Sequence, residues 1–381
     1  MSVARDRIRR RAVESLMSTR KSFISLLSVL VFAGCSAVDS LDFYWQGAAG
    51  QMELVQRARP ISEVIEQSGD AALNARLARV RDIRAFASRD LALPDNGSYT
   101  KYTDLGRPFV LWNVFAAPAL SLTPRQWCFP VAGCVNYRGY FREDDARAEA
   151  TKMRAQGDDV YVSGVPAYST LGWFDDPVLS SFVRWPDTEI ARLIFHELAH
   201  QIVYVKDDTS FNESFAVAVE DAGLARWLAA QRNPALYAQA ARAQRLREVF
   251  SALTRDAREK LTAVYASNRS DEDKLRAKKE TFTAMKAEYE KAKAGELGLA
   301  GYDRWFAQAP NNASLAALSL YSDHVPAFRV LLEEEGNDLP RFYERVRTLA
   351  ALPKSERDSV IAAAASRAQQ LAGVGAVSPA H

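Results

Sequence analysis

His196-Glu197-Leu198-Ala199-His200 is the stretch of this sequence that predicts both a helix and a metal site. Successive residues of an α-helix are turned by about 100°, so residues four apart lie on the same face and both imidazoles can reach one ion. Glu197 then lies beside that ion, where its carboxylate can take a proton from a metal-bound water. The spacing therefore predicts His196 and His200 as zinc ligands and Glu197 as a general base.

The third ligand is expected on a second helix. The first helix should begin at Asp187, a residue suited to an N-cap, because apolar residues follow it at helical spacing. Twelve residues separate His200 from Glu213, and a helix starting near Asn212 would carry this glutamate in its first turn. Three protein ligands leave the fourth position of a catalytic zinc open. We therefore expect one Zn2+ ion held by His196, His200 and Glu213.

Glu220 is a further carboxylate on the expected second helix. It follows Glu213 by seven residues, which places it about 20° away on the same face. One role would be to accept the second N–H of a ligating histidine and fix its tautomer. Another would be to anchor the α-ammonium group of a peptide, and a third alternative is a solvated or salt-bridged helix carboxylate. The sequence leaves these alternatives open.

The combination of His-Glu-x-x-His with a downstream Asn-Glu-x-Phe-Ala is similar to the gluzincin peptidases, which include thermolysin and the membrane alanyl aminopeptidases. Their third ligand is the glutamate of such a motif, although more residues intervene there than here. The chain more closely resembles a family of bacterial lipoproteins named zinc-dependent aminopeptidases, over most of its mature length. The blocks that carry this resemblance are CFPVAGCVNYRGYF (128–141), AYSTLGWFDDP (167–177), HELAHQ (196–201) and FNESFA (211–216).

The N-terminus predicts export. A short apolar run from Ser22 follows two basic residues and ends in Ala33-Gly34-Cys35, the layout of a secretory signal. Cys35 resembles the lipidated cysteine of a bacterial lipobox, which would anchor the protein to a membrane of the cell envelope, facing the periplasm. An ordinary cleaved signal with a free cysteine is the alternative. The basic region before the run is long, so Met17 is an alternative start.

The other two cysteines, Cys128 and Cys134, are expected to form a disulfide. If Cys35 carries lipid, they remain as a pair, and a disulfide persists outside the cytoplasm. Two reduced thiols or two metal ligands are the alternatives, but no further cysteine or histidine lies close to this pair in the sequence.

Composition gives no reason to expect a nucleic-acid partner. The 381 residues carry a formal net charge of +2, and 25% of them are charged. Outside the N-terminal run, no hydrophobic stretch is long enough to span a bilayer. The expected partners are a peptide substrate and, through the lipid, a membrane; the sequence does not predict an oligomeric state.

The expected fold class is α+β, with a gluzincin-like zinc core formed by a small mixed sheet and the zinc-binding helices. Three strands are predicted, at 109–116, 134–141 and 159–165, with a helix at 142–157 between the last two. The expected regions are a signal peptide (1–34), an N-terminal helical region (35–104), the catalytic core (105–232), a helical region with a long hairpin (233–370) and a disordered tail (371–381).

Peptide hydrolysis also needs a hydrogen-bond donor for the oxyanion. Tyr321 is the preferred candidate and His324 the second, both in an apolar segment after the hairpin. Val160–Ala167 is expected to be an edge strand along which a peptide lies extended. A specificity pocket is a weaker expectation, since aromatic residues near a sheet are more often core; its candidates are Tyr168, Trp173 and Phe174.

These patterns predict a zinc-dependent peptidase, and the resemblance implies an aminopeptidase. An endopeptidase with the same metal chemistry is one alternative. The other is a non-catalytic envelope lipoprotein with a structural or vestigial metal site, but a merely structural zinc has no need of a base between its histidines.

Overall fold

The computed structural model describes residues 43–129, 133–167, 169–295, 300–319 and 324–375. The chain is α+β as predicted, with 65% helix and small sheets. It divides into two units, Met1–Glu53 and Leu54–His381. The described residues of the first unit are helical, and the second unit contains the predicted metal site. The predicted signal peptide and Cys35 lie outside the described residues.

A three-stranded antiparallel sheet has the order β6-β3-β7. Its central strand β3 (Leu111–Pro118) pairs with β7 (Asp158–Val165) along its whole length and with β6 (Arg138–Tyr140) near its start. The predicted second strand is divided, because its first part, β5 (Gly133–Val135), pairs instead with β4 (Trp127–Phe129) in a separate hairpin. The described part of this sheet is antiparallel, not mixed.

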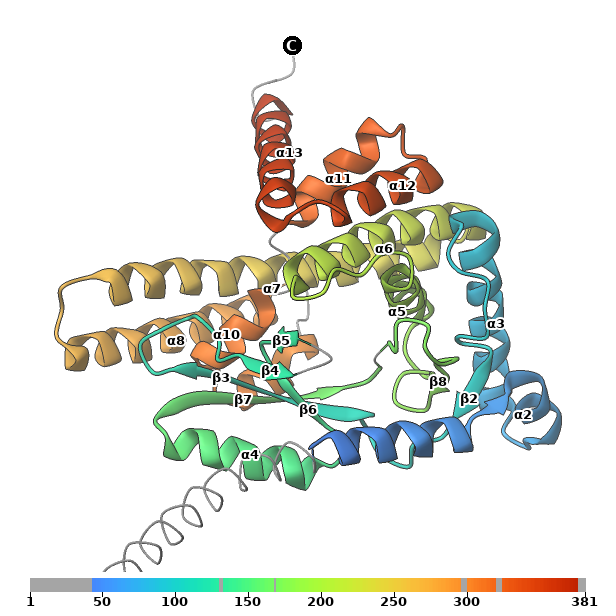
Figure 1. The fold of residues 1–381 in the computed structure, drawn as a ribbon, viewed down its shortest axis with the longest axis horizontal. Coiled ribbons are helices and arrows are strands. Elements are labelled where there is room, and N and C mark those ends of the chain that lie inside the picture. Colours follow the sequence, from blue (N-terminus) through green and yellow to red (C-terminus); the bar gives the residue numbers. More distant parts are fainter. Residues whose placement is uncertain (1–42, 130–132, 168, 296–299, 320–323, 376–381) are drawn as a thin grey trace, which may run out of the picture. The chain divides into compact units, whose positions relative to one another are not determined.

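Helices cover both faces of this sheet (Figure 1). Helix α4 (Glu143–Ala155), which was predicted at 142–157, packs on β3 and β7 from one side. Helix α10 (Asn312–Ser319) packs on the other, where its Ala313 and Ala317 contact Phe115. It covers only the later part of β3, so the earlier residues of that face remain available to line a cleft.

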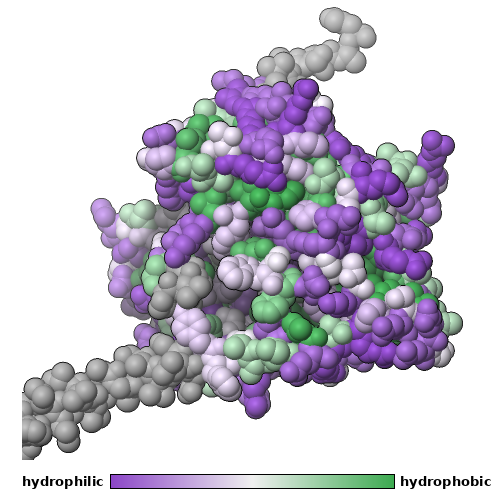
Figure 2. All heavy atoms as spheres, turned by 45° about the vertical axis from the view of Figure 1, so that its right-hand side comes forward, coloured by the Kyte–Doolittle hydropathy of each residue, from purple (hydrophilic) through white to green (hydrophobic). Residues whose placement is uncertain are grey.

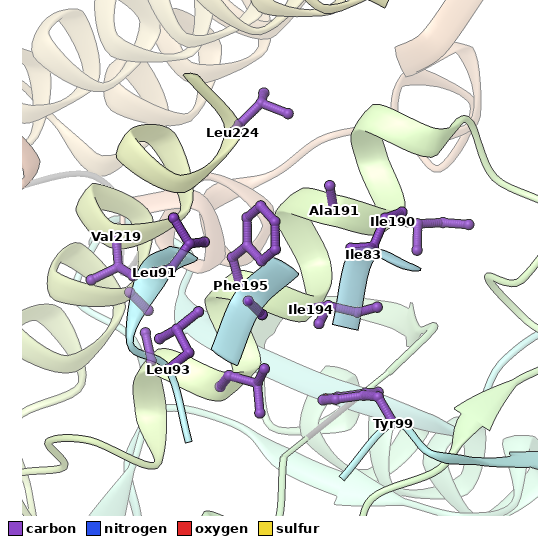
Figure 3. Packing of buried hydrophobic residues seen from close by; sticks show 14 of the residues in the cluster. Ile83, Leu91, Leu93, Tyr99, Ile190, Ala191, Ile194, Phe195, Val219 and Leu224 are labelled. Atoms are coloured by element: carbon purple, nitrogen blue, oxygen red, sulfur yellow. The ribbon is translucent and has the colours of Figure 1, made fainter. Parts of the chain in front are cut away.

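The larger hydrophobic core surrounds α5 (Asp187–His200). Helices α3 (Ala71–Leu91) and α6 (Thr209–Gln231) pack against it, and Figure 3 shows Phe195 of α5 among their side chains. Gly223 of α6 permits this close approach, because a Cβ there would lie 2.8 Å from Leu91 and 2.9 Å from Phe195. The helix that carries both histidines is thus held by packing on two sides.

A second sheet takes two of its strands from the expected N-terminal helical region (35–104) and the third from the catalytic core. It has the order β1-β2-β8 and is mixed, since β1 and β2 are antiparallel whereas β2 and β8 are parallel. Two short strands, β1 and β2, thus lie within the expected N-terminal helical region, because strands of two or three residues leave no alternating pattern in the sequence. The elements are β1 (Arg59–Pro60), α2 (Ile61–Gln67), β2 (Lys101–Thr103) and β8 (Val178–Leu179).

The predicted helical hairpin is present as α7 (Pro234–Ala266) and α8 (Asp271–Ala294). It forms a second hydrophobic core with Trp305, Phe306 and Leu315. Helix α13 continues to Gly375, so the tail predicted from 371 begins too early; residues 376–381 lie outside the described part. The remaining elements are η1 (Ala300–Tyr302), α9 (Asp303–Ala307), α11 (Val325–Glu334), α12 (Leu339–Ala350) and α13 (Lys354–Gly375).

One face of the molecule carries polar and apolar side chains interspersed (Figure 2). In the described part of the chain, no helix combines the length and the apolar character needed to cross a bilayer.

Candidate metal centre

Helix α5 brings His196 and His200 to one face, as their spacing predicts. The rings are 4.8 Å apart between centroids, and their Nε2 atoms are separated by 3.2 Å. The helix begins one residue earlier than a cap at Asp187 would require, because Pro186 occupies the N-cap position. Asp187 instead forms ion pairs with two arginines of α3, at 2.5 Å and 3.0 Å, and these fix the start of α5.

Helix α6 presents Glu213 to the histidines. The helix starts at Thr209, with Asp208 as its N-cap, so Glu213 lies in the second turn and not in the first. The connection to α5 is closed by Asn212, whose side chain accepts from the Val205 N–H and donates to the Val205 carbonyl, each at 2.7 Å. This turn explains how twelve residues suffice to bring Glu213 back to the first helix.

The three predicted ligands converge on one point. Nε2 of His196 lies 3.2 Å from Oε2 of Glu213, and Nε2 of His200 lies 3.7 Å from Oε1 of the same carboxylate. One donor atom from each residue fits within a set whose members are all within 4.8 Å of one another. Zinc–ligand bonds of about 2.1 Å in tetrahedral geometry separate ligand atoms by about 3.4 Å. The donor set therefore fits a zinc ion in both chemistry and spacing.

Glu220 supports His196 from behind. Its Oε2 is 2.9 Å from Nδ1 of His196, which leaves Nε2 of that ring directed at the other two donors. Its Oε1 forms an ion pair with Arg192, which also pairs with Asp221 at 3.0 Å. Both oxygens are thus engaged, and this carboxylate does not line the cleft. The geometry is that of the first and third proposed roles together, because the carboxylate contacts His196 and also forms a salt bridge, and it does not favour the ammonium-anchoring role.

The electrostatics of the site favour cation binding. Burial, together with neighbouring His196, lowers the pKa of His200 to about 4, so its imidazole is neutral. Burial alone would lower the pKa of His196, but hydrogen bonds to Glu213 and Glu220 raise it well above its ordinary value. Burial raises the pKa of Glu197 to about 7. A cation beside these carboxylates would favour their ionised forms.

A cleft of about 280 Å³ opens beside the donor set. Its helical wall holds Glu197 with the three predicted ligands, and its sheet wall comes from β3, β6, β7 and the residues before β6. We had not predicted three polar residues that line it, Asn113, Tyr137 and Tyr204. Tyr204 lies in the connection after α5, which ends at His200, so no helical spacing could indicate it; Tyr137 and Asn113 are brought here by strand pairing.

Other predicted residues lie elsewhere. Trp173 and Phe174 are 85% and 47% exposed and do not line the cleft, whereas their neighbours Ser169 and Leu171 do. His324 lies at the start of α11, and its backbone N–H donates to Ser214 at 3.2 Å. Tyr168 and Tyr321 lie outside the described residues.

The predicted edge strand corresponds to β7, which pairs only with β3 in the sheet as described. Val165 and Ala167, at the end of this segment, line the cleft. A peptide lying along β7 would therefore reach the predicted metal site.

Cys128 and Cys134 form the predicted disulfide, across the β4–β5 hairpin. The backbone N–H of Cys134 donates to Oδ1 of Asp207 at 2.8 Å. The hairpin that leads into Tyr137 is thereby fixed to the connection between α5 and α6.

A family model described as "Putative aminopeptidase" matches residues 42–361. Neither the comparison with curated proteins nor the comparison with solved structures gave a match.

Proposed function

The chain belongs to the putative aminopeptidase family, and from this premise we propose that it is a zinc-dependent aminopeptidase. The observation that carries the proposal is the convergence of His196, His200 and Glu213 within 4.8 Å, beside a cleft that also contains Glu197. A bound zinc ion supplies a Lewis acid that polarises the scissile carbonyl and acidifies water. The three donors hold it, and Glu220 orients His196 through Nδ1.

Glu197 is the proposed general base. It lies next to the first ligand in sequence and lines the cleft, where it takes a proton from the attacking water. The same carboxyl then returns the proton to the leaving amine. General acid–base catalysis of this kind contributes about 10²–10⁴ in rate.

Two tyrosines in the cleft are candidates to stabilise the oxyanion. Burial, reinforced by Glu213, raises the pKa of Tyr137 and of Tyr204, so both hydroxyls are protonated at neutral pH and can donate. Tyr321 stays a candidate from the sequence. Removing the hydroxyl that donates to the oxyanion would lower kcat by about 10²–10³.

We also propose that the protein acts outside the cytoplasm, anchored to the cell envelope by a lipid on Cys35. The disulfide between Cys128 and Cys134 supports this placement, because disulfides persist in oxidising compartments.

The test compares the purified wild-type protein with Glu197→Gln, which keeps the shape of the side chain but removes the base. We expect both proteins to contain one zinc ion by elemental analysis. Turnover of free peptides should fall by about 10²–10⁴ in the variant. If the protein binds one zinc ion but shows no turnover that depends on Glu197, the proposal that it is an enzyme is refuted. If it cleaves only N-acetylated peptides, the proposal that it is an aminopeptidase is refuted.

A further inference from the structure

An aminopeptidase must recognise the α-ammonium group of its substrate, and the obvious carboxylates are already in use. Among the described residues that line the cleft, the carboxylates are those of Glu197 and Glu213, proposed as base and ligand. Glu220 is engaged by His196 and Arg192. The hydrogen-bond acceptor for the substrate's terminus must therefore be sought elsewhere in the cleft.

Asn113 supplies an unused acceptor. Its side chain lines the cleft and is 8% exposed, and its buried Oδ1 has no hydrogen-bond partner among the described residues. Leaving a buried polar atom unpaired costs about 1–3 kcal/mol, so such an atom calls for a partner. Oδ1 also lies over Gly139 of the neighbouring strand, where a Cβ would approach it to 3.1 Å. The missing side chain leaves room for the amide.

Along β3, the residues that line the cleft end at Asn113. Leu111, Asn113 and Phe115 alternate along one face of β3, and the first two line the cleft. Phe115 instead packs against Tyr137 and Tyr161, at 5.5 Å and 6.2 Å between ring centroids, and against α10. Apolar side chains thus fill the next position along the strand. A peptide in the cleft therefore cannot continue along β3 past Asn113.

We propose that Asn113 binds the α-ammonium group of the substrate through Oδ1, at the last position of β3 that lines the cleft, and so makes a free N-terminus the substrate class. This rests on the proposed function. The amide is uncharged, so it selects the terminus by a hydrogen bond. It is a specificity-determining residue and does not touch the scissile bond.

The experiment uses the zinc-loaded, full-length chain and compares wild type with Asn113→Leu, Asn113→Asp and, as a matched control, Asn136→Leu. Asn136 is also an asparagine of this region, but it bonds Gln126 and does not line the cleft. The measurements are zinc content, kcat and KM for peptides with free and acetylated N-termini, and inhibition by leucine hydroxamate and its N-acetyl derivative.

We expect Asn113→Leu to weaken the binding of free-amine substrates and of leucine hydroxamate by about 10–100-fold, the effect of losing one hydrogen bond to a charged group. Zinc content, kcat and inhibition by the acetylated hydroxamate should change little, and Asn113→Asp should retain or strengthen free-amine binding. Equal weakening of free and acetylated ligands, or no weakening, would overturn the assignment. If the leucine variant does not fold, loss of the free-amine preference in Asn113→Asp overturns it, whereas a retained or increased preference supports it.

This outcome is separable from failure of the proposed function. A wild-type protein that hydrolyses no peptide refutes the enzyme, whereas one that cleaves peptides without any dependence on Asn113 refutes only the assignment of the ammonium site.

Discussion

The charged form of Glu197 is needed for the proposed catalysis, but it destabilises the folded protein. Burial first, and then the carboxylates around it, disfavour its charged form and raise its pKa to about 7 in the metal-free site. The proposed base must be ionised to act. The protein therefore keeps a carboxylate where ionisation is costly unless a cation lies beside it.

The free energy of unfolding of the metal-free protein should show this cost. In the unfolded chain Glu197 loses its proton near pH 4.5, but in the folded metal-free protein it does so near 7. The free energy of unfolding of the metal-free protein therefore falls as the pH rises from the unfolded pKa to the folded pKa of Glu197. The fall is about 2 kcal/mol after allowing for partial exposure. Glu197→Gln does not titrate and should be the more stable protein at pH 8. Urea unfolding with chelator at pH 4.5 and pH 8 measures the difference, and identical behaviour of the two proteins at both values would contradict it.

The sequence sufficed for the residues whose chemistry depends on spacing within a helix. His196, Glu197 and His200 could be placed together because the two histidines are four residues apart in a helix, and Glu213 could be placed from its motif. Asn113 could not, because only the pairing of β3 with its neighbours brings it to the cleft. The choice between roles for Glu220 also needed the structure, since Arg192 occupies its second oxygen.

At the scale of elements, long helices could be predicted closely and short strands could not. Helix α4 and the α7–α8 hairpin carry a 3.6-residue apolar pattern over several turns; α4 ends within two residues of the bounds expected for it, and the hairpin is present. By contrast, β1 and β8 are two residues long. The division of the strand predicted at 134–141 follows from a disulfide hairpin that captures its first half.

The proposed ion joins two elements, so its removal should destabilise the protein. His196 and His200 belong to α5 and Glu213 to α6, and a ligand that binds only the folded state adds about 4 kcal/mol at a free concentration of 1,000 times its Kd. Chelation should lower the Tm, and added zinc should restore it.

Glu213→Gln is the control for this measurement. Without the third ligand its Tm should depend much less on chelator. A wild-type Tm that is the same with and without chelator would argue against a metal bridge between these helices.

For the whole molecule, the two largest hydrophobic cores among the described residues carry different tasks. The larger holds α5 and α6, which carry the predicted metal ligands, and the smaller joins the α7–α8 hairpin to Trp305, Phe306 and Leu315. Leu261 is fully buried in the smaller core, so Leu261→Ala should cost about 2–5 kcal/mol of stability. Zinc content should stay unchanged because the helices that carry the predicted ligands pack in the other core.

Leu275→Ala is the matched control, since Leu275 is in the same hairpin but 47% exposed, and its effect should stay within about 0.5 kcal/mol. Denaturant unfolding with zinc analysis distinguishes the two variants. Loss of zinc in Leu261→Ala at temperatures where the protein is folded would show that the two cores are not separable in this way.

The short turn closed by Asn212 has a consequence for assembly. All three donors, and Glu220 behind them, lie between positions 196 and 220 of the chain, so the segment is in effect a compact tridentate chelator. Loop-closure entropy grows with the length of chain between ligands, and here that length is small. A polypeptide emerging N-terminus first could therefore sequester its ion before the C-terminal helices from α7 onward have been released.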